Sequence, residues 1–261
     1  MKITVSSLQK FKNKEKISAI TAYDALFANI FDGEVEIILV GDSLAMNFGG
    51  GEDTIGVSIE EMIYHTKVVR KYVRKSLLIS DMPFGYDSSL KKGLKSALKI
   101  YKKAAPDALK IEVSESKIPL IESLIDNGIA VMGHIGLRPQ FYKHDGGYKV
   151  KGKSEEEKKA LLDLALKLED IGCFGILIEG TKSDIARDIT LKLKIPTIGI
   201  GSGMHTDGQI LVWSDAFGLN NSFKPKFVRE YLNGEGLFKN ALKNYVRDIK
   251  DNKFPNENET Y

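Results

Sequence analysis

The stretch VEIILVGDSLAMNF, residues 35–48, sets a pattern that recurs along the chain. A run of β-branched and aliphatic residues stops at Gly41 and is followed by Asp42 and Ser43. Such an apolar run is typical of a parallel strand that is covered on both faces. In α/β folds, functional residues follow the carboxyl ends of the strands. The stretch therefore predicts a buried strand with an acid at its functional end.

Four later apolar runs end in the same way. They are LLISDMP, ALKIEV, AVMGHIG and FGILIEG, at residues 77–83, 108–113, 130–136 and 174–180, and they end near Asp81, Glu112, His134 and Glu179. One acid at a strand end could be an ordinary loop residue or a helix cap. Four acids and a histidine, each at the end of its own strand, predict a single site.

Seven clear strands alternate with helical segments, and a weaker eighth unit begins at Gln209. This alternation, in a chain of 261 residues, predicts an α/β fold with one domain over residues 1–261, a (β/α)8 or TIM barrel. We expect a helical cap at residues 1–16, amphipathic helices at 224–232 and 237–249, and a polar tail at 252–261. The alternative, a doubly wound open sheet, would concentrate functional residues at its switch point.

The composition excludes several classes of partner. There are 38 basic and 35 acidic residues, and a net charge of +3 is too even to indicate nucleic acid or a membrane surface. The start of the chain lacks the apolar core of a signal peptide, so we expect a cytoplasmic protein. The single cysteine, Cys173, lies among apolar residues and is expected to be a buried filler and not a nucleophile.

Asp42, Asp81 and Glu112 form an all-oxygen set in which His134 is the only nearby nitrogen donor. Hard oxygen ligands select Mg²⁺ or Mn²⁺, and magnesium keeps positions open for water and substrate oxygens. The alternative is that these acids cap helices or pair with Lys110, which shares one side of its strand with Glu112. The joint pattern favours the metal.

A magnesium ion with open positions suits a 2-keto acid, which chelates through a carboxylate oxygen and its keto oxygen. Coordination would stabilise the enolate that forms when the adjacent carbon loses a proton. That step needs a base away from the metal. Glu179 is the unassigned carboxylate, and apolar neighbours would raise its pKa toward neutrality. Lys110 would offset the negative charge of the substrate.

Two glycine-rich loops have the length and composition of functional segments. Residues 47–56, which include GGGEDTIG, lack the lysine and hydroxyl of a phosphate-binding P-loop, so a mobile lid is the better interpretation. Residues 137–153 form a polar stretch that is too long for a tight connection. His65, on the helix after the first of these loops, is expected to be a packed helix residue.

The motifs of this chain resemble those of the ketopantoate hydroxymethyltransferase family, which acts in pantothenate and coenzyme A biosynthesis. The resemblance covers nearly the whole chain, through ITAYD, LVGDSLAM, EEMIYHTKVV, DMPFGY, LKIE, GHIGLRPQ, GGYKVKGK, LIEG, IPTIGIGSG and DGQILVWSDAFGL. It implies a barrel of the phosphoenolpyruvate/pyruvate superfamily. The implied transferase passes a hydroxymethyl group from 5,10-methylenetetrahydrofolate to 3-methyl-2-oxobutanoate, giving 2-dehydropantoate and tetrahydrofolate.

The resemblance also implies roles for individual residues. Asp42, Asp81 and Glu112 match the positions that bind one Mg²⁺ per subunit, and Glu179 matches the proton acceptor. The positions that contact the keto acid are matched by Asp42, Ser43, Asp81 and Lys110, and His134 lies in the same pocket motif as a further substrate contact. Members of this family are cytoplasmic homo-oligomers, often decamers, so the same assembly is expected here.

Five positions depart from the family pattern: Ala45 replaces glycine, Gly56 replaces proline, Arg138 replaces threonine, and Gly180 and Lys182 stand where a Cys-Val-Pro-like stretch is frequent. None of them is a proposed ligand or the base.

Three other functions are compatible with the residues alone. One is another magnesium-dependent carbon–carbon lyase or aldolase for 2-keto acids on the same barrel, although such enzymes typically use a reactive cysteine. A second makes Lys110 a Schiff-base nucleophile. The third is a non-catalytic barrel, which would not explain why every proposed ligand and the base are present.

Overall fold

The computed structural model describes residues 2–220 and 224–261. The chain divides into two compact units, Met1–Val212 and Trp213–Tyr261. The first unit contains all the residues of the predicted site. The prediction of one domain over residues 1–261 stays a prediction.

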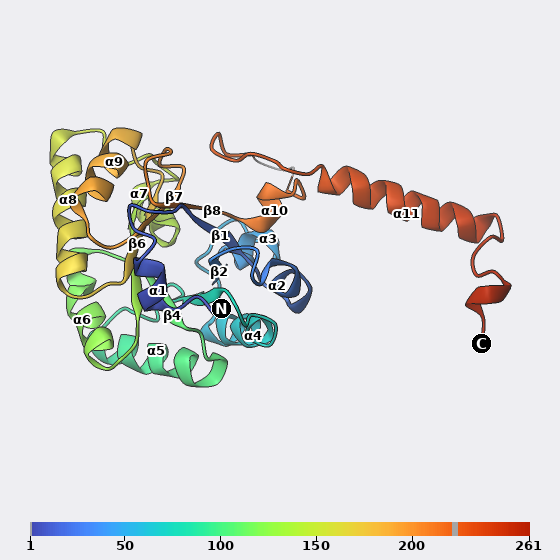
Figure 1. Ribbon diagram of the computed structural model, residues 1–261, viewed down its shortest axis with the longest axis horizontal. Coiled ribbons are helices and arrows are strands. Elements are labelled where there is room, and N and C mark those ends of the chain that lie inside the picture. The colour runs from blue at the N-terminus through green and yellow to red at the C-terminus, as the bar shows by residue number, and fades with distance from the viewer. Residues whose placement is uncertain (1, 221–223) are drawn as a thin grey trace. The chain divides into compact units, whose positions relative to one another are not determined.

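The first unit contains eight parallel strands that close into a barrel in their order along the chain (Figure 1). They are β1 Ile17–Thr21, β2 Ile37–Val40, β3 Leu77–Asp81, β4 Ala108–Glu112, β5 Val131–Gly136, β6 Gly175–Glu179, β7 Thr197–Ile200 and β8 Gly208–Leu211. Pairing of β8 with β1 closes the barrel, with Gly208 opposite Ile17. The closed sheet confirms the predicted barrel, including its weak eighth strand, and excludes the open doubly wound sheet.

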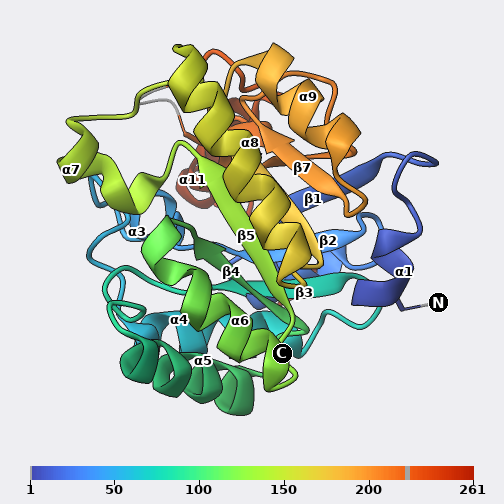
Figure 2. The same ribbon diagram turned by 90° about the vertical axis from the view of Figure 1, so that its left-hand side faces the viewer.

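Helices follow most of the strands, and Figure 2 shows α5, α6, α8 and α9 on the outside of the barrel. The α-helices of the first unit are α1 Val5–Gln9, α2 Ala25–Phe31, α3 Leu44–Asn47, α4 Ile59–Arg70, α5 Leu90–Ala104, α6 Ile118–Asp126, α7 Tyr142–Asp145, α8 Glu155–Asp170 and α9 Ser183–Lys192. Two short 3₁₀ helices, η1 Glu115–Lys117 and η2 Pro139–Phe141, complete the set in the described part of this unit.

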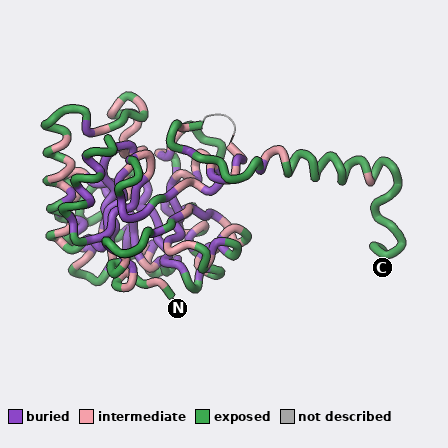
Figure 3. Tube along the Cα trace, turned by 45° about the horizontal axis from the view of Figure 1, so that its top comes forward, coloured by how far each residue is buried: buried purple, intermediate pink, exposed green. Residues whose placement is uncertain are grey.

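Alternation along each strand decides which side chains enter the barrel. In β3, Leu77 and Ile79 belong to the inner apolar cluster. Asp81 is two residues after Ile79 and therefore lies on the same, inner side of the sheet. In β4, Ala108 belongs to that cluster, whereas Leu109 belongs to the outer cluster that packs against the helices. Figure 3 shows the strands as the buried centre of this unit. A period of two residues therefore directs chemical groups inward at the carboxyl ends of the strands.

A short helix closes the amino-terminal end of the barrel. The Thr4 side chain accepts a hydrogen bond from the Ser7 backbone N–H and starts α1. Leu8, on the inner face of α1, is fully buried and packs in the inner cluster with Ile17 and Ile37. The structure thereby confirms the predicted helical cap, and substrates must enter from the opposite end.

Two sequence predictions about irregular segments were wrong in part. Residues 137–153 are not a plain loop, because η2 and α7 lie within them. No helix forms in the described residues 224–232. The Tyr231 N–H, which a helix would pair with the Phe227 carbonyl, donates instead to the Ala216 carbonyl at 2.7 Å, and a turn joins the Val228 N–H to the Pro225 carbonyl.

The second unit contains α10 Trp213–Ala216, α11 Gly234–Lys250 and the 3₁₀ helix η3 Glu257–Glu259. The long helix α11 confirms the helix predicted at 237–249. Among the helices of the described residues, none combines the length and the apolar character needed to cross a membrane.

We predict that Leu8→Ala lowers the free energy of unfolding by about 3 kcal/mol, because it removes buried methyl groups and leaves a cavity at the closed end of the barrel. Gln9→Ala, an exposed position in the same helix, is the matched control and should change stability by less than about 0.5 kcal/mol. Denaturant titration measures both values. Equal stabilities of the two variants would show that Leu8 does not support the barrel.

Candidate active site

The carboxyl ends of five neighbouring strands bring the predicted residues together. Asp81 is directly opposite Lys110 in the register of β3 and β4, and Glu112 is opposite His134 in that of β4 and β5. Glu179 is the last residue of β6, and Asp42 lies two residues beyond the end of β2. All six of these residues are therefore at the open end of the barrel.

Asp42 and Asp81 are joined through the backbone. The Asp42 N–H donates to Asp81 Oδ2 at 2.9 Å, and Lys110 Nζ lies 3.0 Å from Asp81 Oδ1. Asp81 and Lys110 therefore form a buried ion pair, and the charge of Asp81 contributes to the raised pKa of Lys110. Asp42 could have been a helix cap, but its side chain accepts from Gln140 and α3 has no side-chain cap.

Gln140, which the sequence analysis did not identify, connects the acids. Its Nε2 donates to Asp42 Oδ2 at 2.7 Å and to the Met82 carbonyl at 2.9 Å, while its backbone N–H lies 3.2 Å from Glu112 Oε2. Gln140 is buried in η2 and is the last residue of the motif GHIGLRPQ. That motif was the only available signal, because an irregular segment has no periodicity from which to predict side-chain direction.

His134 connects the lysine to the glutamate at the rim. Lys110 Nζ lies 3.2 Å from His134 Nδ1, and His134 Nε2 lies 3.3 Å from Glu179 Oε2. An ammonium can only donate, so Nδ1 accepts and the neutral ring carries its proton on Nε2, toward Glu179. Burial, followed by the charge of Lys110, holds the pKa of His134 well below its usual value. His134 is therefore a neutral side chain that lies between Lys110 and Glu179.

Three carboxylates share one buried ammonium, and the pKa values of Asp42 and Glu112 reflect the imbalance. Burial and then the charge of Asp81 raise the pKa of Asp42 to about 7, and burial and then Asp42 raise that of Glu112 well above its usual value. Burial opposes the charged form of Lys110, but Asp81, Asp42 and Glu112 together raise its pKa. Lys110 thus stays protonated, whereas Asp42 and Glu112 bind protons more readily than free carboxylates do.

Glu179 differs from the other three acids in its accessibility. Its side chain is 20% exposed, whereas that of Glu112 is 1% exposed. Desolvation raises its pKa to about 7, and Lys110 lowers it by a smaller amount. A carboxylate with these properties can accept a proton from a molecule bound at the open end of the barrel.

The oxygen-rich set satisfies the chemical requirements of a hard divalent cation. Three buried acids lie around one ammonium, and all three offer oxygen donors of the kind that a hard cation prefers. Among the described residues, however, no three side chains of histidine, cysteine, aspartate or glutamate are arranged so that they could hold a metal ion together. Lys110 and Gln140 contact the oxygens that such a cluster would use.

Ser43 lies beside this set and is held by an aromatic residue. The Ser43 hydroxyl is 2.8 Å from the Tyr23 hydroxyl, and His65 Nδ1 is 2.6 Å from the Tyr23 carbonyl. His65 also contacts the ring of Phe48 edge-on. His65 is therefore the packed helix residue that the sequence predicted. Cys173 is buried in the outer core cluster, and burial raises its thiol pKa to about 12, as expected for a filler.

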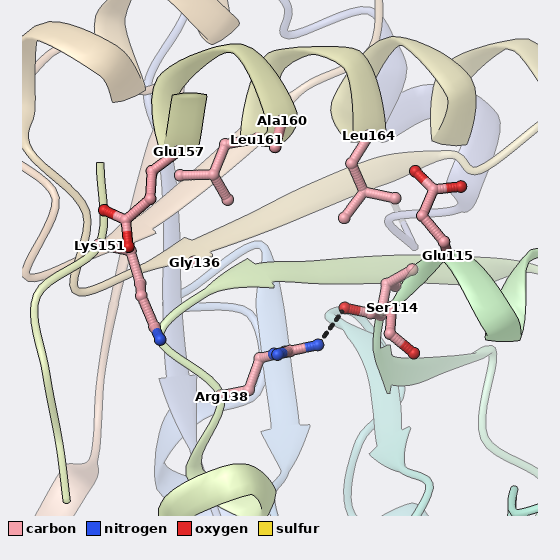
Figure 4. Close-up of a pocket in the computed structure, with 10 residues that line it drawn as sticks. Ser114, Glu115, Gly136, Arg138, Lys151, Glu157, Ala160, Leu161 and Leu164 are labelled. Carbon is pink, nitrogen blue, oxygen red and sulfur yellow. Dashed lines mark hydrogen bonds between the residues drawn. The ribbon is translucent and has the colours of Figure 1, made fainter. Parts of the chain in front are cut away.

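A cavity of about 310 Å³ lies between β5 and α8 and contains none of the predicted site residues (Figure 4). Arg138 lines it, donating from Nη1 to the Val113 carbonyl at 2.9 Å and lying over the Phe141 ring. Glu115 pairs with Lys167 at 2.9 Å, and Lys151 pairs with Asp145 at 2.6 Å. Arg138, Lys151 and Glu115, which line this cavity, are thus engaged in contacts within the protein.

Residues 2–257 match the family model described as ketopantoate hydroxymethyltransferase. The chain belongs to the ketopantoate hydroxymethyltransferase family. A 3-methyl-2-oxobutanoate hydroxymethyltransferase of Helicobacter hepaticus is 54% identical over 260 residues, covering 100% of this chain and 98% of the relative. One of Wolinella succinogenes is 52% identical over 259 residues, covering 99% of each chain.

Solved structures with similar folds come from a wider group. A phosphonopyruvate hydrolase in complex with oxalate and Mg²⁺ has a TM-score of 0.64 at 11% identity, covering 99% of this chain and 93% of its own. A 2,3-dimethylmalate lyase of the PEP mutase/isocitrate lyase superfamily has a TM-score of 0.62 at 15% identity, covering 98% and 88%. These similarities agree with the barrel fold and concern the fold alone.

Family membership confirms the predicted hydroxymethyltransferase function, and with it the assignment to pantothenate biosynthesis. It supports this function over the carbon–carbon lyase and Schiff-base alternatives, and the chain is an enzyme and not a non-catalytic barrel.

Proposed function

We propose that this site binds 3-methyl-2-oxobutanoate and adds to its C3 the one-carbon unit of 5,10-methylenetetrahydrofolate, giving 2-dehydropantoate and tetrahydrofolate. The main support is the contrast between Glu179 and the other acids: one partly exposed carboxylate at the rim, with a pKa raised to about 7, stands apart from three that are buried. Glu179 is therefore suited to accept a proton, whereas the three buried acids are suited to hold a metal ion.

Asp42, Asp81 and Glu112 would hold one Mg²⁺. When bound, the ion would polarise the keto group of the substrate and so stabilise negative charge that develops beside C3. The keto acid would lie against Asp42, Ser43, Asp81 and Lys110, with the ammonium of Lys110 offsetting the substrate carboxylate. His134 would add a further polar contact.

Glu179 is the proposed proton acceptor. C3 of the keto acid loses its single hydrogen as a proton to the Glu179 carboxylate, and the electron pair left on C3 forms the new bond to the one-carbon unit. Water supplies the hydroxyl group of the product and one proton. The two C–N bonds that hold the methylene group in the donor break, and the two nitrogens released take up the proton from water and the proton from C3, giving tetrahydrofolate. Neutral His134, with Nε2 at 3.3 Å from Glu179 Oε2, positions this carboxylate without holding it in a charged pair.

We predict that native protein with Mg²⁺ exchanges the C3 hydrogen of the keto acid for deuterium in the absence of folate, and that Glu179→Gln slows this exchange by a factor of about 10³. Nuclear magnetic resonance of the keto acid measures the rate. Glu122→Gln, an exposed position on α6, is the matched control. Unchanged exchange in Glu179→Gln would remove Glu179 as the base.

The same measurement has an expected pH dependence. A base must be ionised to accept a proton, and burial raises the pKa of Glu179 to about 7. Exchange should therefore rise with pH through about 7 and level off above it, since protonation at lower pH removes the acceptor. A rate that falls as pH rises through this range would contradict the assignment.

We predict that the metal-free protein binds Mn²⁺, used as a spectroscopic substitute for Mg²⁺, and that Asp81→Asn weakens this binding by about 100-fold because it removes a ligand charge. Electron paramagnetic resonance measures free Mn²⁺ without relying on activity. Asp87→Asn, an acid paired with Lys117 beyond the end of β3, is the control.

EDTA should also abolish exchange of the C3 hydrogen. Borohydride with the keto acid should not inactivate the enzyme, as it would a Lys110 Schiff base.

We also propose a homo-oligomer of ten subunits in the cytoplasm, in line with the resemblance to the family. Helix α11 supports self-association, because Phe238, Leu242, Tyr245, Val246 and Ile249 fall on one stripe of the helix and are 39% to 62% exposed. An exposed apolar stripe of this kind is typical of an interaction surface.

We predict a particle ten times the 29.0 kDa chain mass, and its dissociation when Phe238→Glu and Leu242→Glu are combined, since charges would enter the apolar stripe. Light scattering after size exclusion measures the mass. The control is Lys239→Glu with Lys243→Glu, two exposed positions of the same helix. A monomeric native protein would refute the assembly.

A further inference from the structure

Residues 137–153 contain a pair of aromatic side chains that have no role in the proposed function so far. The rings of Tyr142 and Tyr148 have centroids 4.7 Å apart and planes tilted by 39°. Tyr148 is 44% exposed, so one part of this pair remains open to a ligand. The exposed face of an aromatic ring held in such a pair is an apolar surface on which a planar heterocycle can stack.

One end of this segment is fixed beside Glu179. The Lys151 N–H donates to the Gly180 carbonyl at 2.9 Å, and the Lys182 N–H donates to the Lys151 carbonyl at 3.1 Å. Lys151 and Thr181 therefore form an isolated parallel bridge directly beyond β6. Tyr148 precedes this bridge by only three residues.

The other contacts of the segment reach toward Asp42 and Ser43. The Tyr148 hydroxyl donates to Met46 Sδ at 3.6 Å, and Met46 lies on α3, three residues after Ser43. Lys143 Nζ lies 3.7 Å from Asp53 Oδ2 in the glycine-rich segment 47–56. Tyr148 thus lies between the ends of β6 and β2, over the open end of the barrel.

The electrostatic surroundings of Tyr148 agree with this position. Burial, followed by the charges of Asp53 and Glu179, raises the pKa of its hydroxyl to about 12. The Tyr148 hydroxyl therefore stays neutral.

The segment is also strongly basic. Residues 138–153 contain five lysine or arginine residues and a single acid, Asp145. Lys143 and Lys149 are exposed, and the Lys143 side chain retains 71% of its accessible surface despite its contact with Asp53. The positive charge of residues 138–153 is opposite in sign to that of the acids at the strand ends, and the binding of a metal ion would not require it.

We propose that the pair Tyr142 and Tyr148 stacks against the bicyclic ring of the folate donor, and that Lys143 and Lys149 attract the carboxylates of its glutamate tail. The inference rests on the proposed function, which requires a folate. A pteridine is flat and the glutamate tail is anionic, so the two parts of the donor match the two features of the segment. The keto acid has no ring and needs neither.

The test compares Tyr148→Ala with Tyr148→Phe in the full-length enzyme loaded with Mg²⁺. Tyr148→Ala should raise KM for 5,10-methylenetetrahydrofolate about tenfold, because the stacking surface is lost. Tyr148→Phe keeps the ring and should restore KM to within about twofold of the native value. Tyr72→Ala is the matched control, since Tyr72 is also 44% exposed but precedes β3 at the closed end of the barrel.

Deuterium exchange at C3 without folate separates this inference from the proposed function. Exchange that persists in Tyr148→Ala, together with a raised KM for the folate, supports the stacking site. Persisting exchange with an unchanged KM overturns it and leaves the function intact. Loss of exchange in Tyr148→Ala would also overturn it, because Tyr148 would then serve the keto acid. Native protein without exchange would overturn the function and this site together.

The tail is tested by comparing mono- and tetraglutamate forms of the donor. Native enzyme should have a KM several-fold lower for the tetraglutamate, and Lys143→Ala combined with Lys149→Ala should remove most of that difference. Equal KM values for the two forms in native enzyme would overturn the role of the lysines.

Discussion

Three buried carboxylates and a single ammonium at the open end of the barrel are the constraint on which the site depends. Lys110 ion-pairs with Asp81 and contacts His134, so it links the acids of β2, β3 and β4 to the glutamate of β6. One positive charge cannot balance three negative ones, and the raised pKa values of Asp42 and Glu112 express that deficit. A divalent cation is the chemical group that would remove it.

Much of this arrangement could be predicted from the sequence, because a strand has a period of two. Leu77, Ile79 and Asp81 alternate with outward residues, so the apolar pattern that places the first two inside the barrel also places the acid there. The same holds for Lys110 and Glu112. Family resemblance added the identity of the substrate, which periodicity could not supply.

Prediction failed where no period exists. Gln140 and Tyr23 contact the site residues, but both lie outside the strands, in segments whose side-chain directions depend on tertiary contacts. Residues 224–232 have a helical pattern of apolar residues, yet the described part of this stretch has no helix, because local propensity did not decide its conformation. The barrel itself is shared with lyases and hydrolases at 11% to 15% identity, so only particular side chains distinguish the chemistry.

The bridge between Lys151 and Thr181 has an evolutionary consequence. It consists of backbone hydrogen bonds, which almost any pair of residues can form, so the aromatic segment stays attached to the barrel whatever side chains it acquires. Side chains of this segment can therefore change during evolution while its attachment beside the end of β6 is kept.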